Sequence, residues 1–205
     1  SMKEHVKSMG GNVDGILRFS IQWNENFDNQ NDFDAHCVEP NGNEIYFQNK
    51  CYKHSSSGML DVDIVFPENR IAVENIIYTD FNMMPEGTYN FFVNVYSYRN
   101  GRNGFSAEIE FDEQIYFFQY PKDVKRNENI MIAKVKYDKK EGFQIIRFLD
   151  SSVSSRTIWG LNTNQFYPVS ALMYSPNYWD QQSGVGHKHY FFIINGCKNA
   201  DQPNG

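Results

Sequence analysis

A short segment near the start of the chain contains residue types that bind metal ions. Asp32, Asp34 and His36 occupy alternate positions in NDFDAHCVEPNGNEIYF, at residues 31–47. In a β-strand, side chains two residues apart share one face of the sheet, so two carboxylates and one imidazole would be adjacent. Such a row is able to ligate a cation. It is equally compatible with a strand face that contacts water, on which Asp32 forms a weak surface pair with Lys50.

A second segment repeats the alternation of acidic and apolar residues. In GMLDVDIVF, at residues 58–66, Asp61 and Asp63 alternate with apolar residues that would face a core. If the two rows are adjacent, their carboxylates repel one another unless a cation neutralises them. Ca²⁺ takes about six to eight oxygen ligands, which carboxylates and backbone carbonyls can supply. We therefore predict that any bound cation is Ca²⁺, held by these side chains: Asp32, Asp34, Asp61 and Asp63.

The C-terminal part of the chain offers a second candidate metal site. His187 and His189 are two residues apart in GVGHKHYFFIING, a spacing that places both imidazoles on one face of a strand. Residues 190–195 contain no acidic ligand, so a third ligand must come from elsewhere, with Asp180 and His54 as candidates. The alternative is that both histidines form ordinary hydrogen bonds at a strand edge.

Aromatic residues provide candidates for ligand binding. Trp159 and Trp179 lie in the C-terminal part of the chain, where they are able to form a platform for a sugar ring. His36 and Tyr46 are a further candidate pair, because the first hairpin is expected to bring them together. Core packing is the alternative role for all of these side chains.

The segments that carry these residues have the pattern of an all-β protein. Runs rich in Val, Ile, Phe and Tyr recur between turns that contain Gly, Asn and Pro. Strands at this spacing, with no helix predicted between them, indicate an antiparallel sandwich or a partly closed barrel, of which we predict the β-sandwich, with a jelly-roll-like topology. The predicted strands cover residues 17–23, 32–39, 43–50, 59–66, 73–79, 88–98, 105–111, 114–120, 129–138 and 143–149.

The sequence PNG at residues 40–42 sets a register for the first hairpin. With Gly42 in the left-handed conformation, a three-residue loop results and Cys37 faces Ile45. This register separates Cys37 from Cys51 by roughly 20 Å, which excludes a disulfide between them. Continued along both strands, it predicts further neighbours: Ala35 with Phe47, Phe33 with Asn49, His36 with Tyr46, Asp34 with Gln48, and Asp32 with Lys50.

Composition divides the chain into three parts. We predict a flexible N-terminal segment at residues 1–16, the sandwich at residues 17–150, and an aromatic-rich C-terminal extension at residues 151–205. An extension of about fifty residues rarely buries enough surface to fold alone. It is therefore predicted to pack on the sandwich.

Charge and motif content argue against several classes of protein. The 205 residues carry a formal net charge of -6 and show no stripe of Lys and Arg suited to nucleic acid or an anionic membrane. The apolar runs are too short to cross a bilayer. No nucleophile elbow or phosphate-binding glycine-rich loop is present, so the sequence does not indicate an enzyme. Three cysteines without a CxxC pair favour a bacterial cytoplasm.

Several of these motifs resemble the pattern of the uncharacterised bacterial YfaP-like domains, over roughly residues 17–149. The resemblance implies a β-sandwich module of bacterial multidomain proteins and no assigned activity. More distantly, FDAHCVEPNGNEIYF is similar to the TerD-type stress proteins, which are β-sandwiches that bind calcium through acidic loops. Here Ser55-Ser56-Ser57 stands where those proteins have an acidic loop. The YfaP-like motifs are DFDAH at residues 32–36, PNG at 40–42, LDVD at 60–63, ENI at 74–76, and GTY at 87–89 followed by VNVYSYR.

The sequence thus predicts a non-catalytic binding or interaction module of a bacterial multidomain protein, with calcium as a stabilising ion. Its partner would be a protein or another domain of a larger chain, with neither nucleic acid nor membrane as partner. Two alternatives remain. The aromatic residues suit a carbohydrate-binding β-sandwich, and His187 with His189 suits a metal-dependent hydrolase.

Overall fold

The computed structural model of the chain describes residues 1–51, 56–149, 155–158, 161–162, 169–178 and 186–194. The chain forms two units, Ser1–Ser155 and Arg156–Gly205. The first unit contains the sandwich and the carboxylates of interest, and the described residues of the second contain strands paired as hairpins.

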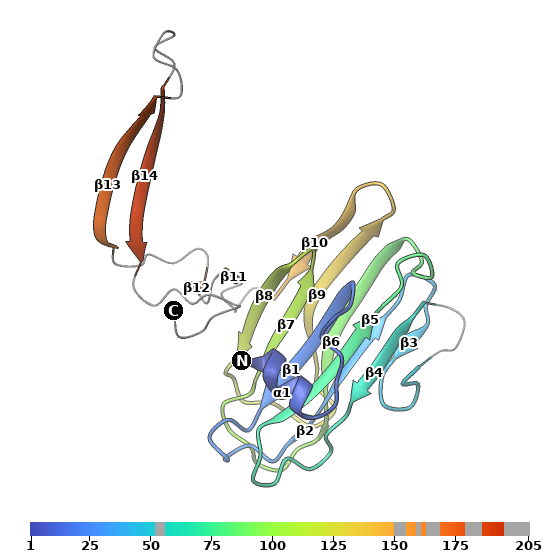
Figure 1. Cartoon of the computed structure of the whole chain (residues 1–205). Helices are drawn as coiled ribbons and strands as arrows, with labels where there is room; N and C mark the ends of the chain where they lie inside the picture. The colour runs from blue at the N-terminus through green and yellow to red at the C-terminus, as the bar shows by residue number, and fades with distance from the viewer. Residues whose placement is uncertain (52–55, 150–154, 159–160, 163–168, 179–185, 195–205) are drawn as a thin grey trace. The chain divides into compact units, whose positions relative to one another are not determined.

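Two antiparallel sheets form the first unit (Figure 1). The sandwich predicted from the sequence is therefore confirmed. Within residues 1–149, one sheet has the order β8-β7-β1-β5-β4 and the other has the order β10-β9-β6-β2-β3. The strands of the first sheet are β1 (Leu17–Trp23), β4 (Gly58–Val62), β5 (Ala72–Tyr78), β7 (Phe105–Phe111) and β8 (Gln114–Tyr120). Those of the second are β2 (Asp32–Val38), β3 (Glu44–Ile45), β6 (Gly87–Ser97), β9 (Asn129–Asp138) and β10 (Gly142–Phe148).

Alternate residues of the facing strands fill the space between the sheets. In β6 the odd-numbered apolar residues from Tyr89 to Val95 are buried, while their neighbours are more exposed. The ring of Trp23 meets the ring of Phe33 edge to face at a centroid distance of 5.5 Å. Phe33 in turn contacts Phe105, at 5.3 Å, so one aromatic cluster joins both sheets.

A short helix, α1 (Met2–Ser8), begins the first unit. A capping box between Ser1 and Glu4 starts it, and the side chains of Met2 and Val6 are buried. Residues 2–8 of the N-terminal segment predicted to be flexible thus form a helix. The helix precedes the strands, between which none was predicted, and seven residues are too few to show a helical period. No helix among the described residues is both long and apolar enough to cross a membrane.

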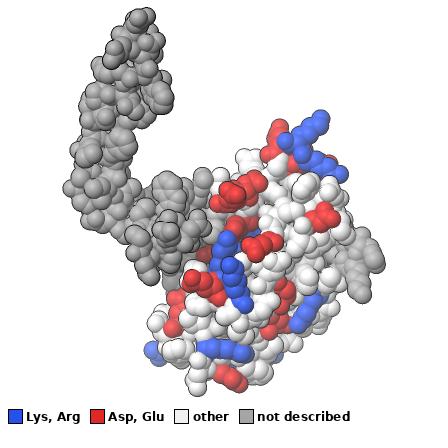
Figure 2. All heavy atoms as spheres, viewed as in Figure 1, with Lys and Arg blue, Asp and Glu red and all other residues white. Residues whose placement is uncertain are grey.

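Charged side chains on the outer face of the β1 sheet pair with one another. Arg18 is buried and its Nη2 donates to Glu108 Oε2 at 2.9 Å and to Glu110 Oε2 at 2.8 Å. Lys3 Nζ, from α1, also reaches Glu110, at 2.8 Å. On the face of the molecule in Figure 2, acidic and basic side chains of the described residues are interspersed, and no broad basic patch is visible there.

The first hairpin has the predicted register beside its turn. Cys37 pairs with Ile45 and Val38 with Glu44, and Gly42 has φ +84°. Cys37 is buried and Cys51 is exposed, and both are free thiols, as expected.

Beyond Ile45 the predicted register is wrong. Strand β3 ends at this residue because the chain turns back on itself, and the backbone N–H of Asn49 donates to Tyr46 O at 2.9 Å. Because of this second turn, the residues that follow Ile45 do not pair with β2. The pairs that consequently do not form are Ala35 with Phe47, Phe33 with Asn49, Asp34 with Gln48, and Asp32 with Lys50.

The second unit contains two antiparallel hairpins in its described residues. One joins β11 (Ser155–Ile158) to β12 (Leu161–Asn162), and the other joins β13 (Val169–Tyr178) to β14 (Gly186–Ile194). The packing of this extension on the sandwich stays a prediction.

If α1 docks as described, Val6→Ala will destabilise the first unit by about 2 kcal/mol, because two buried methyl groups are lost and a cavity remains. Met9→Ala is the matched control, since Met9 is exposed, and its effect should stay below about 0.5 kcal/mol. Urea unfolding of the full chain measures both. Equal effects of the two substitutions would show that the N-terminal segment is detached from the sandwich.

Candidate functional site

Four carboxylates meet where one edge of the sandwich closes. Asp32 and Asp34 lie on β2, Asp63 follows β4, and Glu74 lies on β5. Ligand atoms of Asp34, Asp63 and Glu74 are all within 4.8 Å of one another. Asp32, Asp34 and Asp63 line one cavity. The structure thus brings together three of the four aspartates predicted from the sequence and adds a glutamate.

Three of these four residues are buried and Asp63 is partly buried, so the interpretation of Asp32 and Asp34 as a face in contact with water is wrong. Asp32 is 2% exposed, Asp34 3% and Glu74 0%. The chain after β3 covers this face of β2, with Phe47 beside the carboxylates in the lining of the cavity. One oxygen of each acidic residue is buried and receives no hydrogen bond from a neutral or basic group: Asp32 Oδ1, Asp34 Oδ2, Asp63 Oδ1 and Glu74 Oε1. Glu74 is able to form a hydrogen bond with Asp63 only when one of the two carries a proton, and this contact helps to raise the pKa of Glu74.

Glu74 reaches the cluster because β3 is short. Strand β3 pairs with β2 only at Cys37 and Val38, which leaves the next backbone N–H on that edge, that of Ala35, without a strand partner. Glu74 Oε2 accepts a hydrogen bond from this N–H at 2.6 Å. A side chain from the opposite sheet therefore completes the edge of β2, and its other oxygen points to the cluster without a partner of its own.

Asp61 is held away from the other carboxylates. Its Oδ2 accepts a hydrogen bond from the Asn12 backbone N–H at 2.6 Å, and its Oδ1 accepts one from Asn75 Nδ2 at 2.7 Å. The pairing of β4 with β5 has an irregularity between Leu60 and Val62, which is where Asp61 lies. The place that the sequence predicted for Asp61 beside Asp34 and Asp63 is occupied by Glu74.

The sequence contains one signal that could have identified Glu74. It is a charged residue in the middle of AVENIIY, whose seven residues are all buried in β5. A buried carboxylate in such a strand requires a partner. The partner is the edge of β2, and neither strand alone predicts that the two are adjacent.

The carboxylates hold protons more tightly than isolated ones do. Burial, helped by the charges of Asp32 and Asp63, raises the pKa of Asp34 to about 7. Burial raises the pKa of Asp32 to about 6, although Arg99 opposes the shift. Burial and the charge of Asp34 raise the pKa of Glu74 well above its usual value. The cluster is therefore unstable as a set of bare charges and favours either protons or a cation.

One ammonium group already contacts the cluster. Lys50 Nζ lies 2.8 Å from Asp63 Oδ2. Lys50 is the residue that the sequence paired with Asp32, and the turn after β3 moves it to Asp63 instead. Half of the Lys50 side chain remains exposed, so it neutralises one carboxylate at the surface of the cluster.

The cavity beside the carboxylates has a volume of about 230 Å³. Its remaining lining residues are apolar or aromatic: Phe47, Val65 and Tyr96. Phe47 meets Tyr96 edge to face, at a centroid distance of 5.1 Å. Negative charge and apolar surface thus share one hollow.

His36 anchors the chain that covers the cluster. Its ring stacks on Tyr46 at 5.0 Å, as the hairpin register predicted, and on Phe92 at 4.6 Å. Its Nδ1 lies 2.7 Å from Glu44 Oε1, while burial lowers its pKa. The imidazole does not line the cavity. In this structure His36 and Tyr46 therefore pack, and they present no open surface to a ligand at this cavity.

The candidates in the C-terminal extension are only partly described. His187 and His189 lie on β14, opposite Asn177 and Ser175. Their side chains lie outside the described part of the chain, as do Trp159, Trp179, Asp180 and His54.

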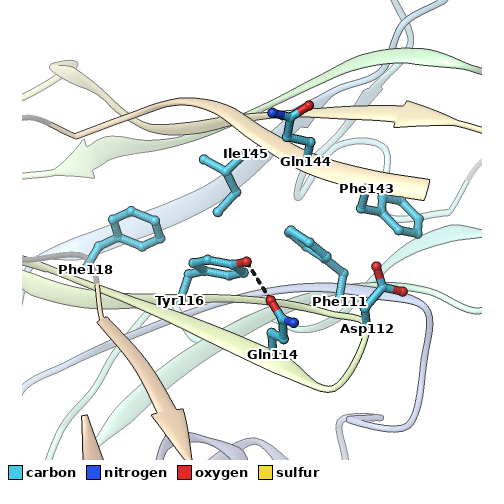
Figure 3. Close-up of a pocket in the computed structure, with 8 residues that line it drawn as sticks. All are labelled: Phe111, Asp112, Gln114, Tyr116, Phe118, Phe143, Gln144 and Ile145. Atoms are coloured by element: carbon cyan, nitrogen blue, oxygen red, sulfur yellow. Dashed lines mark hydrogen bonds between the residues drawn. The ribbon is translucent and has the colours of Figure 1, made fainter. Parts of the chain in front are cut away.

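A second cavity, of about 350 Å³, lies between β8 and β10 (Figure 3). Phe143 and Ile145 project from β10 toward the rings of Phe111 and Tyr116. The Tyr116 hydroxyl donates to Gln114 Oε1 at 2.8 Å. Among the lining residues only Asp112 is charged. This cavity offers apolar surface but no set of groups suited to catalysis or metal binding.

Comparisons with protein-family models, with curated proteins and with solved structures found no match for the chain. The resemblances noted in the sequence stay predictions. A function is therefore inferred from the geometry of the carboxylate cluster.

Without a cation, stability should fall as pH rises. The pKa of Asp34 is about 7 in the folded chain against an ordinary value of 3.8. The proton on Asp34 therefore contributes to the free energy of unfolding in full below about pH 4, and this contribution is lost as pH rises through about 7. In chelator, Tm should drop by several degrees between pH 5 and pH 8. Asp34→Asn should reduce the drop. A wild-type Tm that is constant or rises over this range would contradict the assignment.

Proposed function

We propose that this protein is a non-catalytic binding module whose ligand site is the carboxylate cluster, and that Ca²⁺ occupies the cluster. One observation carries the proposal. Four buried carboxylate oxygens, none of which receives a hydrogen bond from a neutral or basic group, belong to residues at one edge of the sandwich. Such groups are costly unless something neutralises them.

The ligand set supports calcium over other metals. The three clustered side chains, Asp34, Asp63 and Glu74, offer only oxygen atoms. Calcium binds oxygen at about 2.4 Å, so two of its ligands lie at most about 4.8 Å apart, and the ligand atoms here lie within 4.8 Å of one another. Zinc prefers nitrogen and sulfur, and magnesium requires a stricter octahedral geometry.

The lining of the cavity supports binding in place of catalysis. It includes no Ser, Cys or His, so catalysis by a hydroxyl or thiol nucleophile with a histidine base has no side chains there. The hydrolase alternative would rest on His187 and His189, whose side chains lie outside the described residues. The context of a bacterial multidomain protein is proposed from the sequence resemblance alone.

Calcium should raise the thermal stability of the wild-type chain, and chelator should reverse the effect. At a hundredfold excess over Kd, binding to the folded state alone adds about 2.7 kcal/mol. For a unit of this size that corresponds to a Tm increase of roughly 5–10 °C. Isothermal titration at pH 8 should give one site per chain, whose affinity falls at least tenfold in Glu74→Gln and is lost in the double variant Asp34→Asn with Asp63→Asn.

Asp61→Asn is the matched control, because Asp61 is equally acidic and near in sequence but lies outside the cluster. It should be less stable, since an amide nitrogen is unable to accept one of the two hydrogen bonds that Asp61 receives, yet it should keep the wild-type calcium affinity. Loss of binding in Asp61→Asn with retention in Glu74→Gln would refute this assignment of ligands. An unchanged wild-type Tm with millimolar calcium would refute the function.

A further inference from the structure

The cavity beside the carboxylates has features that a metal ion does not need. Its volume of about 230 Å³ far exceeds the roughly 30 Å³ share of one water molecule in the liquid. Half of its lining residues are Phe47, Val65 and Tyr96. A bound ion would contact the carboxylates and make no use of these side chains. The combination instead suits a ligand that has both a positive charge and an apolar portion.

The molecule itself shows how positive groups bind in this region. The ammonium of Lys50 contacts Asp63, while Asp32 Oδ1 and Asp34 Oδ2 have no partner. Beside the cavity, the guanidinium of Arg99 lies 4.4 Å from the centroid of the Phe66 ring. Carboxylates and aromatic faces therefore both accept cations here.

We propose that the cavity binds the side chain of a lysine presented by a protein partner, an inference that rests on the same carboxylate cluster as the proposed function. The ammonium would donate to the carboxylates of Asp32 and Asp34, both of which line the cavity. The four-carbon stem would lie against Val65 and the aromatic rings.

Exposed apolar surface around the cavity favours a protein over a free amine. Val65 is 42% exposed, Phe66 58% and Tyr96 48%. A small amine would leave most of this surface in water, whereas a protein contact would cover it. The net charge of -6 also favours association with a basic partner.

Calcium and the lysine compete, because both need Asp34. Binding of either adds positive charge beside the other, so each weakens the other by the same factor. Calcium would therefore release the partner. Lys50 is already present as an internal competitor for Asp63.

The direct test titrates the ¹⁵N-labelled full chain with Nα-acetyl-lysine N-methylamide in chelator. The expected result is saturable shifts of amide signals from β2 and around Tyr96, which excess calcium reverses. The matched ligand, acetylated also at Nε, keeps the stem but loses the charge, and its affinity should be at least tenfold lower.

Two substitutions separate the aromatic from the acidic contribution. Tyr96→Leu should weaken the lysine ligand about three- to fivefold through loss of the aromatic surface against which the stem packs, with calcium affinity unchanged. Asp34→Asn should weaken both ligands. Phe81→Leu is the control, since Phe81 is an exposed aromatic that does not line this cavity, and it should weaken neither.

The outcomes distinguish this inference from the proposed function. If calcium binds and the lysine ligand does not, the inference is overturned and the calcium site stands. Equal binding of the Nε-acetylated ligand would also overturn it, as would spermidine binding tenfold more tightly than the lysine ligand, which would assign the cavity to free polyamines. Binding of the lysine ligand without any calcium binding would leave the lysine site and remove its regulation.

Discussion

Burial of negative charge at one edge of the sandwich is the constraint on which the site depends. A β-sandwich must cover the edges of its sheets, and here β3 is too short to cover β2 beyond Val38. Glu74 from the opposite sheet supplies the missing hydrogen bond. The strand edge is thereby satisfied, and a second carboxylate is placed beside Asp34 in a region with little water. The burial of the carboxylates and their raised pKa values follow from this use of a Glu74 side chain where a strand partner is missing.

The surrounding structure holds the carboxylates in place when their repulsion opposes it. His36 stacks between Tyr46 and Phe92 and fixes the chain after β3 over the cluster. Lys50, at the end of the same segment, contacts Asp63. Burial raises the pKa values of Asp32 and Asp34, so protons remove part of the remaining charge. A cation is the alternative to those protons. Binding of either one to the folded chain stabilises it.

The sequence predicted the sandwich, most strand positions and the turn at Gly42, because alternation and turn residues are local signals. It also identified Asp34 and Asp63, since both follow that alternation. It placed Asp61 in the site because period two cannot reveal a bulge, and it omitted Glu74 because a strand buried on both faces has no alternation to read. Strand β3 was predicted too long because its composition suits a strand, whereas the turn at Tyr46–Asn49 depends on tertiary packing.

The central claim is that protons and a cation exchange at one cluster, and calorimetry measures that exchange directly. Calcium is titrated at pH 6.5 in buffers with different enthalpies of ionisation, and the dependence of the heat on the buffer gives the number of protons released. With pKa values of about 7 for Asp34 and about 6 for Asp32, the account predicts release of roughly one proton or more per calcium ion. Calcium binding with the same heat in every buffer would contradict it, because the ion would then occupy carboxylates that were already ionised.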